Sequence, residues 1–298
     1  MRIRASIATA SILHLRNYRI KVEPTTLYFM LSGKCEGSCL YCTHRKGYLS
    51  RIKWPEFSFK EVKSRIGKTR AKRICIQCPY MERCMDALKK ILEEIKNEKP
   101  ISLSIAAISK EEMKMLKEEG VERIGIGLDC ATEEIFNKWK KGVPSWKKYM
   151  EAIKNAKEIF GDATCHLIIG LGESDEEAIS LMENMKKKGV RIALFAYFWK
   201  NKNVVDIHRY RVMQIARYVI EKGTKRKFLF ENGRLLEMEI DEIDKKAFMT
   251  AGCPSCNRPF YNERVTKIYN YPYLLSEEEF ERAVKEARKY AGIYIASE

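Results

Sequence analysis

The sequence predicts an α/β fold, a partial TIM barrel of six strand–helix units, (β/α)6, closed by a C-terminal cap. Short β-branched runs alternate with amphipathic helical stretches, which is the pattern of a parallel sheet. Cysteine, acidic and glycine-rich segments follow the ends of these runs, at the rim where such barrels gather their chemistry. The alternation ends near residue 200. We therefore expect an N-terminal arm in residues 1–24, the barrel in 25–200 and a C-terminal extension in 201–298.

Six apolar runs are expected to form the barrel strands, because each is short and rich in β-branched or aromatic residues. They span residues 25–31, 71–78, 101–108, 121–130, 163–171 and 190–198. Helices are expected between them. In residues 81–98 apolar side chains recur at steps of three and four, and the next helix begins with Ser109 as N-cap and stops at Gly120.

The C-terminal extension has a different pattern and is interpreted as a cap on the barrel, because no linker or low-complexity run sets it apart. Its expected elements are a long helix at 206–223, a hairpin at 225–240 that turns at Asn232-Gly233, and a last helix near 276–291.

The composition limits the classes of partner and compartment. The 298 residues are 45% hydrophobic and carry a formal net charge of +16, so an acidic partner is expected: nucleic acid, an anionic membrane surface or an acidic protein.

No apolar run approaches the roughly 20 residues of a membrane span. Residues 1–13 resemble a signal peptide only in part, and a surface helix or arm is preferred. The ten cysteines are clustered, which favours metal ligation or catalysis in a reducing cytoplasm.

Cys35, Cys39 and Cys42 form a C-x3-C-x2-C motif directly after the first predicted strand. Three thiolates on one loop can hold three irons of a [4Fe-4S] cubane and leave the fourth iron open to a substrate. Zinc is the alternative, with His44 as the nearest candidate for a fourth ligand. The motif therefore predicts a metal centre at the barrel mouth, and we prefer the cluster.

Five further cysteines offer ligands for a second cluster. Cys75, Cys78 and Cys84 lie across the end of the second predicted strand and the start of the next helix, and Cys253 and Cys256 belong to the tail segment GCPSC. Four of these five are expected to hold an auxiliary [4Fe-4S] cluster. Structural zinc on the two C-x2-C pairs is the alternative. The other such residues in the strands are interpreted as buried groups, not ligands: Cys130, Cys165 and His166.

The cysteine motif, with aromatic Tyr41 before its last cysteine, resembles the signature of the radical S-adenosylmethionine (SAM) superfamily. Members carry it after the first strand of a partial barrel. The resemblance implies that the open iron chelates SAM, which is split into methionine and a 5′-deoxyadenosyl radical. The segment HLIIGLGES resembles the family's strand-five motif, which implies that Gly170, Gly172 and Glu173 meet the adenine and ribose side of the cofactor.

Tyr41, Gln77 and Asp129 are the other candidates for cofactor contact, because all three are expected at the same rim. The family's usual Gly-Gly-Glu after the second strand is absent, and the chain has IQCPY there. The resemblance therefore assigns no residue to the methionine end. Three residues beside the last cysteine pair are further candidates for contact with a cluster or acyl chain: Asn257, Arg258 and Tyr261.

Within the biotin and lipoyl synthase branch of this family, the chain is most similar to archaeal-type two-protein lipoyl synthases. The segments that carry the similarity are RASIATASIL, RICIQC, IGLDCATEEIF and GCPSCNRPFYNE. The similarity implies a sulfurtransferase that takes sulfur from the auxiliary cluster and inserts it into C6 and/or C8 of a protein-bound octanoyl-lysine. In single-chain lipoyl synthases a serine completes that cluster, and Cys253 or Cys256 would replace it here.

The implied partners are an acidic octanoylated carrier such as the glycine-cleavage H protein or a lipoyl domain, a second related radical SAM subunit, and an electron donor such as ferredoxin. Two alternatives remain open. One is another radical SAM sulfur insertion, such as biotin-synthase-like chemistry or tRNA methylthiolation, and the other is a non-catalytic iron–sulfur partner subunit. RNA is disfavoured because no RNA-binding domain with an aromatic signature is recognisable.

Overall fold

The computed structural model describes residues 1–44, 48–200 and 202–296. A single eight-stranded sheet forms its centre, in the order β10-β9-β8-β7-β6-β2-β1-β5. Six neighbouring strands are parallel and match the six predicted runs: β2 Thr26–Leu31, β6 Arg73–Gln77, β7 Ile101–Ile105, β8 Val121–Asp129, β9 Ala163–Ile169 and β10 Arg191–Ala196. Because β10 and β5 are the two edges, the sheet curves without closing, and the predicted partial barrel is confirmed.

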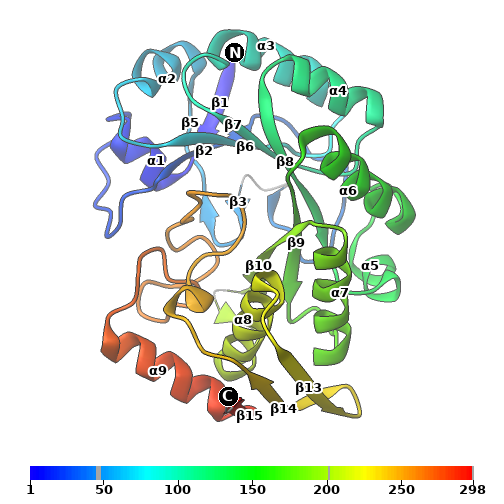
Figure 1. Cartoon of the computed structure of the whole chain (residues 1–298). Helices are drawn as coiled ribbons and strands as arrows, with labels where there is room; N and C mark the ends of the chain where they lie inside the picture. The colour runs from blue at the N-terminus through cyan, green and yellow to red at the C-terminus, as the bar shows by residue number, and fades with distance from the viewer. Residues whose placement is uncertain (45–47, 201, 297–298) are drawn as a thin grey trace.

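Helices follow the parallel strands and cover the outside of the sheet (Figure 1). They are α2 Phe59–Ile66, α3 Cys84–Ile95, α4 Lys110–Glu118, α5 Glu133–Trp139, α6 Trp146–Phe160 and α7 Asp175–Lys187. In α3 the periodic side chains of Leu88, Leu92 and Ile95 are buried, as the spacing predicts. At α4 the hydroxyl of Ser109 accepts from the N–H of Glu112, whose carboxylate accepts from the N–H of Ser109, so the predicted N-cap forms a capping box.

The N-terminal residues extend the sheet, whereas we expected a surface helix or arm. Strand β1, Arg2–Ala5, pairs antiparallel with β2 and with β5, Glu56–Ser58, and is followed by the short helix α1, Ile7–Ile12. Ile3 and Ala5 are fully buried. They alternate with two arginines, so the segment has the period of a strand with one buried face, but four residues are too few to separate it from a helical start.

The C-terminal extension forms the predicted helices and hairpin and adds two strands that were not predicted, β15 and the short β12, Lys202–Asn203. Its elements are α8 Ile207–Lys222, β13 Arg226–Glu231, β14 Arg234–Ile240, the 3₁₀ turn Lys245–Phe248, α9 Glu277–Arg288 and β15 Gly292–Ile295. The hairpin turns at Asn232 and Gly233, both with positive φ, as predicted. Strand β15 pairs parallel with β14, a contact between distant segments that no local pattern predicts. None of the helices in the described residues is both long and apolar enough to cross a membrane.

Between the 3₁₀ turn and α9 the chain runs back to the inner side of the curved sheet (Figure 1). We call residues 250–265 the tail loop. Asn257 fastens it to the start of β2: its side-chain oxygen accepts from the N–H of Thr25 at 3.1 Å and its amide donates to the carbonyl of Glu23 at 2.9 Å. Two short hairpins lie nearby, β3 Tyr48–Leu49 with β4 Ile52–Lys53 and β11 Phe198–Trp199 with β12 Lys202–Asn203.

Candidate functional site

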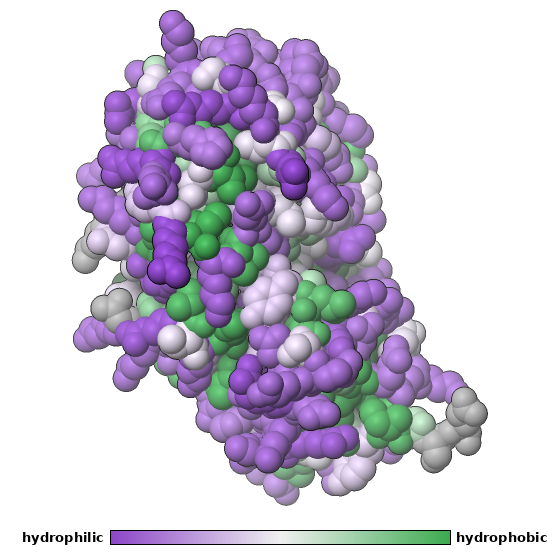
Figure 2. Space-filling view, turned by 90° about the vertical axis from the view of Figure 1, so that its left-hand side faces the viewer, coloured by the Kyte–Doolittle hydropathy of each residue, from purple (hydrophilic) through white to green (hydrophobic). Residues whose placement is uncertain are grey.

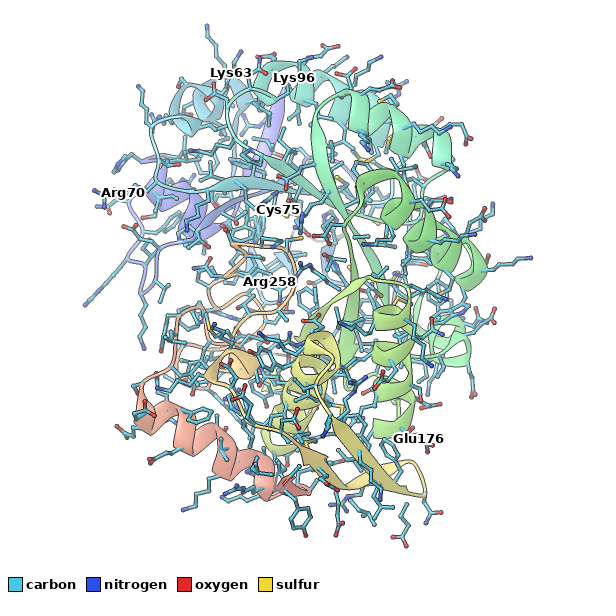
Figure 3. The ribbon with its side chains drawn as sticks, in the orientation of Figure 1. Lys63, Arg70, Cys75, Lys96, Glu176 and Arg258 are labelled. Atoms are coloured by element: carbon cyan, nitrogen blue, oxygen red, sulfur yellow. The ribbon has the colours of Figure 1, made fainter. Side chains whose placement is uncertain are left out.

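A cavity of about 280 Å³ runs from the carboxyl ends of the parallel strands into the barrel interior, and we call it the reaction cavity. Seven of the predicted site cysteines line it: Cys35, Cys39, Cys42, Cys75, Cys78, Cys253 and Cys256. Figure 3 shows Cys75 on β6 and Arg258 of the tail loop in the interior of the molecule. Three distant segments of the sequence therefore supply thiols to one space.

The loop that carries Cys35, Cys39 and Cys42 lies at the rim and is held by backbone hydrogen bonds. The N–H of Ser38 donates to the carbonyl of Lys141 at 2.7 Å, and the N–H of Leu40 donates to that of Trp139 at 2.9 Å. Burial raises the pKa of the Cys39 thiol and raises that of Cys42 to about 12. Cys35 and Cys39 are half-buried and Cys42 is exposed. A thiol becomes a thiolate when a metal binds it, so the loop fits three ligands of a cluster.

Three thiols of the second set lie deeper in the barrel. The amide of Gln77 donates to Cys75 Sγ at 3.2 Å, and the hydroxyl of Tyr28 donates to Cys256 Sγ at 3.4 Å. Cys253 Sγ lies 3.6 Å from Oγ1 of Thr164, near the amino end of β9. Burial raises the pKa of Cys75, and its two neighbouring tail thiols raise it further. The tail loop therefore places two thiols beside the one that β6 provides.

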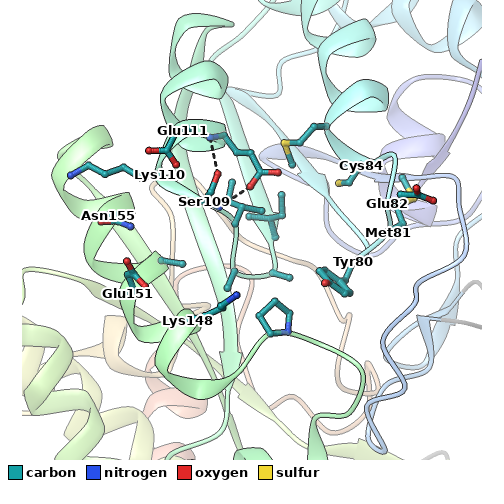
Figure 4. Close-up of a pocket in the computed structure, with 18 of the residues that line it drawn as sticks. Tyr80, Met81, Glu82, Cys84, Ser109, Lys110, Glu111, Lys148, Glu151 and Asn155 are labelled. Carbon is teal, nitrogen blue, oxygen red and sulfur yellow. Dashed lines mark hydrogen bonds between the residues drawn. The ribbon is translucent and has the colours of Figure 1, made fainter.

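Cys78 and Cys84 form a pair apart from these three. Burial and then the hydrogen bond with the Cys84 thiol raise the pKa of Cys78. Cys84 does not line the reaction cavity. It lies at the start of α3 in an outer cavity of about 680 Å³ between α3, α4 and α6, where Figure 4 shows it beside Met81. Of the five candidates for the second cluster, four line the reaction cavity, and the buried Cys84 lines the outer cavity.

Asp129 lies at the end of β8 with a positive φ of 69° and faces the cysteine loop. Its carboxylate accepts from the Tyr41 hydroxyl at 2.5 Å and pairs with the buried ammonium of Lys140 at 2.9 Å. Burial disfavours both charges, but their mutual attraction outweighs it, so the pKa of Asp129 is lowered and that of Lys140 is raised. Lys140 also donates to the carbonyl of Gly127. The sequence reasoning missed Lys140, since nothing local marks it as buried.

The glycine segment after β9 forms a tight turn around Glu173. Gly170 and Gly172 have φ of 108° and 113°, a region open mainly to glycine. The Glu173 carboxylate accepts from the N–H groups of Gly170 and Leu171 at 2.8 and 2.9 Å, and it pairs with Arg209 at 3.0 Å. This carboxylate supports the turn and does not line the reaction cavity, so its contact with a cofactor stays a prediction.

Two polar side chains face the middle of the cavity. The guanidinium of Arg258 lies 4.1 Å from the centre of the Phe195 ring and donates to the carbonyl of Ala251 at 2.9 Å. His166 on β9 also lines the cavity, with its ring edge-on to that of Phe195, and burial lowers its pKa to about 4. The imidazole is therefore neutral near pH 7. Cys130 and Cys165 are fully buried outside the cavity, as expected.

Within the part of the chain that the structure describes, no three cysteine, histidine or carboxylate side chains converge as ligands of a single metal ion. A zinc ion needs such convergence, because all its ligands bind one centre at about 2.0–2.3 Å. In a cubane each cysteine binds a different iron, so the thiols stand farther apart. The described residues therefore present no preformed zinc site.

Comparison with curated proteins finds relatives named biotin synthase. The protein from Hydrogenobaculum sp. (strain Y04AAS1) is 31% identical over 181 residues, which are 57% of this chain and 54% of that protein. The one from Prochlorococcus marinus (strain MIT 9515) is 27% identical over 283 residues, covering 88% of this chain and 80% of that protein. The chain spans about half the length of several of these relatives.

Solved structures of low sequence identity share the fold. Methylornithine synthase (PylB) superposes with a TM-score of 0.53 at 15% identity, covering 72% of this chain and 66% of that one. The [FeFe]-hydrogenase maturase HydG from Carboxydothermus hydrogenoformans gives 0.52 at 18% identity, with 66% and 51% covered. The family model described as Radical SAM superfamily matches residues 29–185, more than half of the chain, and that range contains the rim cysteines and strands β6 to β9. The chain therefore belongs to the radical SAM superfamily.

Proposed function

We propose that this radical SAM enzyme inserts sulfur from an auxiliary [4Fe-4S] cluster into C6 and/or C8 of a protein-bound octanoyl-lysine, as a lipoyl synthase component. The observation that carries the proposal is the reaction cavity, in which the rim cysteines and four further thiols line one space of about 280 Å³. An electron-relay cluster could lie away from the reacting atoms. A sulfur donor must share the cavity with the substrate.

The positions of the thiols in the reaction cavity indicate which residues would hold each of the two clusters. Cys35, Cys39 and Cys42 would hold the rim cluster, whose open iron would bind SAM. Four others, Cys75, Cys78, Cys253 and Cys256, would hold the auxiliary cluster. When bound, the first cluster with SAM supplies a radical that abstracts hydrogen, and the second supplies sulfur.

The remaining cavity wall suits an aliphatic chain. Leu103, Ile105, Ile168, Phe195 and Phe198 line the reaction cavity, so burial of an eight-carbon acyl chain there is favoured by roughly 0.8 kcal/mol per methylene. The same apolar wall excludes water and the small solutes that would quench a radical. Arg258 and neutral His166 offer hydrogen bonds in the middle of the wall.

The charge of the chain supports an acidic carrier as the partner. A net charge of +16 attracts an acidic protein over distances up to about the Debye length, roughly 10 Å at 0.1 M salt. We further propose that a related radical SAM subunit shares the two insertions and that a ferredoxin-like protein provides electrons in a reducing cytoplasm.

A second candidate is sulfur insertion into a free small molecule, and the curated relatives named biotin synthase favour it. The same two sets of thiols would serve that reaction. The candidates differ in the acceptor, since a carrier-bound chain requires a surface for the carrier and a free precursor does not.

The decisive experiment is anaerobic reconstitution with iron and sulfide, followed by reaction with SAM, reductant and either an octanoylated carrier or the sulfur-free precursor of biotin. Mass spectrometry of a carrier peptide that gains one or two sulfur atoms supports the proposal. A gain of sulfur by the biotin precursor alone supports the second candidate. Formation of no 5′-deoxyadenosine with any acceptor, or methylthiolation of added tRNA alone, overturns both.

A further inference from the structure

An apolar groove of about 630 Å³ lies on the face formed by α1, the segment after it and the tail loop. Half-buried or exposed apolar side chains line it, among them Ile20, Val22, Ile52 and Val265. Figure 2, which views the molecule from this side, shows apolar side chains in a strip flanked by hydrophilic ones. The face thus combines an apolar floor with a charged border.

The groove and the reaction cavity share a wall. Residues 48–50 of the β3–β4 hairpin and Arg258, Tyr261 and Asn262 of the tail loop line the reaction cavity. Arg51 and Ile52 of the same hairpin, and Pro259, Phe260 and Val265 of the same loop, line the groove. Tyr261 lines both, and its ring packs edge-on against Tyr28 at 5.1 Å and Trp54 at 5.5 Å. A molecule bound in the groove is therefore separated from the reaction cavity only by the hairpin and the tail loop.

Arg51 fixes this wall in place. Its Nε donates to the carbonyl of Glu263 at 2.8 Å and to that of Phe260 at 3.3 Å, which ties the hairpin to the tail loop. The guanidinium therefore binds carbonyl groups of its own chain. Its position keeps the groove in a fixed shape before any partner binds, which lowers the entropic cost of docking.

The exposed positive charges of the groove come from the segment 19–22. Arg19 and Lys21 are exposed and alternate with the half-buried Ile20 and Val22, so basic groups point outward and apolar groups toward the floor. Neither Arg19 nor Lys21 has an ion pair or hydrogen bond within the described residues. No carboxylate among the described residues pairs with either cation.

We propose that this groove is the docking surface for the acidic carrier protein. Carboxylates of the carrier would pair with Arg19 and Lys21, and an apolar side chain next to the modified lysine would lie on the floor. The acyl arm would then extend around the edge of the shared wall, whose Tyr28, Trp54 and Tyr261 are packed and buried, to the reaction cavity. The inference rests on the proposed function, since it assumes an acyl carrier, and it commits to an acidic protein because the free charges of the groove are cationic.

Isothermal titration calorimetry with an octanoylated, acidic H protein tests the proposal without turnover. The charge-reversed R19E/K21E enzyme is compared with K114E/K187E, which makes the same charge change at exposed lysines of α4 and α7. We expect the first variant to raise Kd about tenfold or more and to weaken its dependence on salt, and the control to change Kd far less. Equal Kd values for the two variants overturn the docking surface.

A second measurement separates this inference from the proposed function. With turnover, R19E/K21E should raise KM for the carrier while kcat, and KM for a short uncharged octanoyl-lysine peptide, stay unchanged. If the unaltered enzyme adds sulfur to neither substrate, the proposed function fails whatever the calorimetry gives. If the charge reversal instead changes the oligomeric state in gel filtration, the groove is an interface between copies of this chain and the carrier proposal is wrong.

Discussion

Tyr28 joins β2 to the tail loop at the base of the reaction cavity. Its hydroxyl donates to Cys256 Sγ and accepts from the N–H groups of Asn257 and Arg258 at 3.0 and 2.9 Å. The side chain is buried. One phenol therefore satisfies two backbone donors and positions the last cysteine of the second set.

Replacing Tyr28 with phenylalanine should leave both backbone N–H groups without an acceptor. We expect a loss of about 1–3 kcal/mol in the free energy of unfolding, measured by denaturant titration. The spectroscopic signal of the auxiliary cluster should also weaken after reconstitution, while that of the rim cluster stays. Tyr294→Phe, at an exposed position, is the matched control and should change neither quantity; equal effects in the two variants would contradict the role of Tyr28.

The Asp129–Lys140 pair predicts a dependence of stability on pH. The lowered pKa of Asp129 gives stabilisation that is present above the ordinary carboxyl value of roughly 3.9 and is lost as pH falls through the lower folded value. The raised pKa of Lys140 gives stabilisation that is present below roughly 10.4 and is lost as pH rises through the higher folded value. The pair thus contributes fully between these two limits.

Lys140→Met should leave the Asp129 carboxylate buried without its cation and cost about 3–5 kcal/mol in the free energy of unfolding near neutral pH. Urea titrations of the variant and the parent protein at several pH values measure this difference. It should shrink below about pH 4, because protonation of Asp129 removes the uncompensated charge. Lys138→Met, at an exposed position of α5, the helix that ends just before Lys140, should cost little at any pH. A difference that does not shrink as pH falls from about 7 to about 3 would argue against the pair.

At the residue scale, the sequence predicted the thiols because their spacing is local, and the structure gathers seven of them. Lys140 and Tyr28 could not be predicted as site residues. Each acts through a partner far away in sequence, and neither lies in a motif. Glu173 is the opposite case. The motif that contains it could be recognised in the sequence, but the partners of its carboxylate could not. The two backbone N–H groups and Arg209 meet the carboxylate only in the turn that it stabilises.

At the scale of elements, the tail loop brings Cys253 and Cys256 to β6 and is itself shaped by unusual backbone angles. Gly252 has φ of 133°, and three other residues of the loop, Ser255, Arg258 and Phe260, have positive φ without being glycine. Such conformations cost of order 1–3 kcal/mol each and persist where surrounding contacts enforce them. Asn257 and Tyr28 provide those contacts.

Gly252→Ala should disturb this loop in two ways. The new side chain would hold an unfavourable φ, and its Cβ would lie 3.1 Å from that of Ala193. We expect a loss of about 1–3 kcal/mol in stability and less iron bound after reconstitution. Gly161→Ala is the control, since its φ of 73° is also positive but nothing lies within 4 Å of the added Cβ. Gly161→Ala should lose stability without losing iron. Iron loss in both variants would show that the loss does not depend on the tail loop.

The strands and helices of the barrel were predictable because each carries its own period of apolar residues. The six parallel strands and the hairpin at Asn232-Gly233 follow that rule. Strands β1, β5 and β15 do not. Each has four residues or fewer and is a strand only because a neighbour is present to pair with it, so the information lies in the tertiary contact.

At the scale of the whole molecule, the charge of +16 bears on the encounter with a partner more than on the fold. Charges at a docking border act mainly on the association rate and are screened by salt. The barrel interior, which is apolar and buried, is screened far less. Partner binding and the chemical step should therefore respond differently to ionic strength.

Raising the salt concentration from about 50 to 500 mM should raise KM for the octanoylated carrier severalfold and leave kcat unchanged. A short uncharged octanoyl-lysine peptide should show no such rise in KM, because it has no acidic surface to steer. Steady-state kinetics on the two substrates under anaerobic conditions check this. A parallel rise in both KM values would show that salt acts on the enzyme itself.

The reaction cavity is assembled from parts that leave the ribosome at different times. The rim cysteines and the first strands are synthesised early, and domains generally fold from the N-terminal side as they emerge, whereas Cys253 and Cys256 follow only after the whole barrel. The nascent barrel therefore has an open base until the tail loop arrives. A ribosome stalled after β10 would display a chain that has the three rim cysteines and still lacks two of the four ligands proposed for the second cluster.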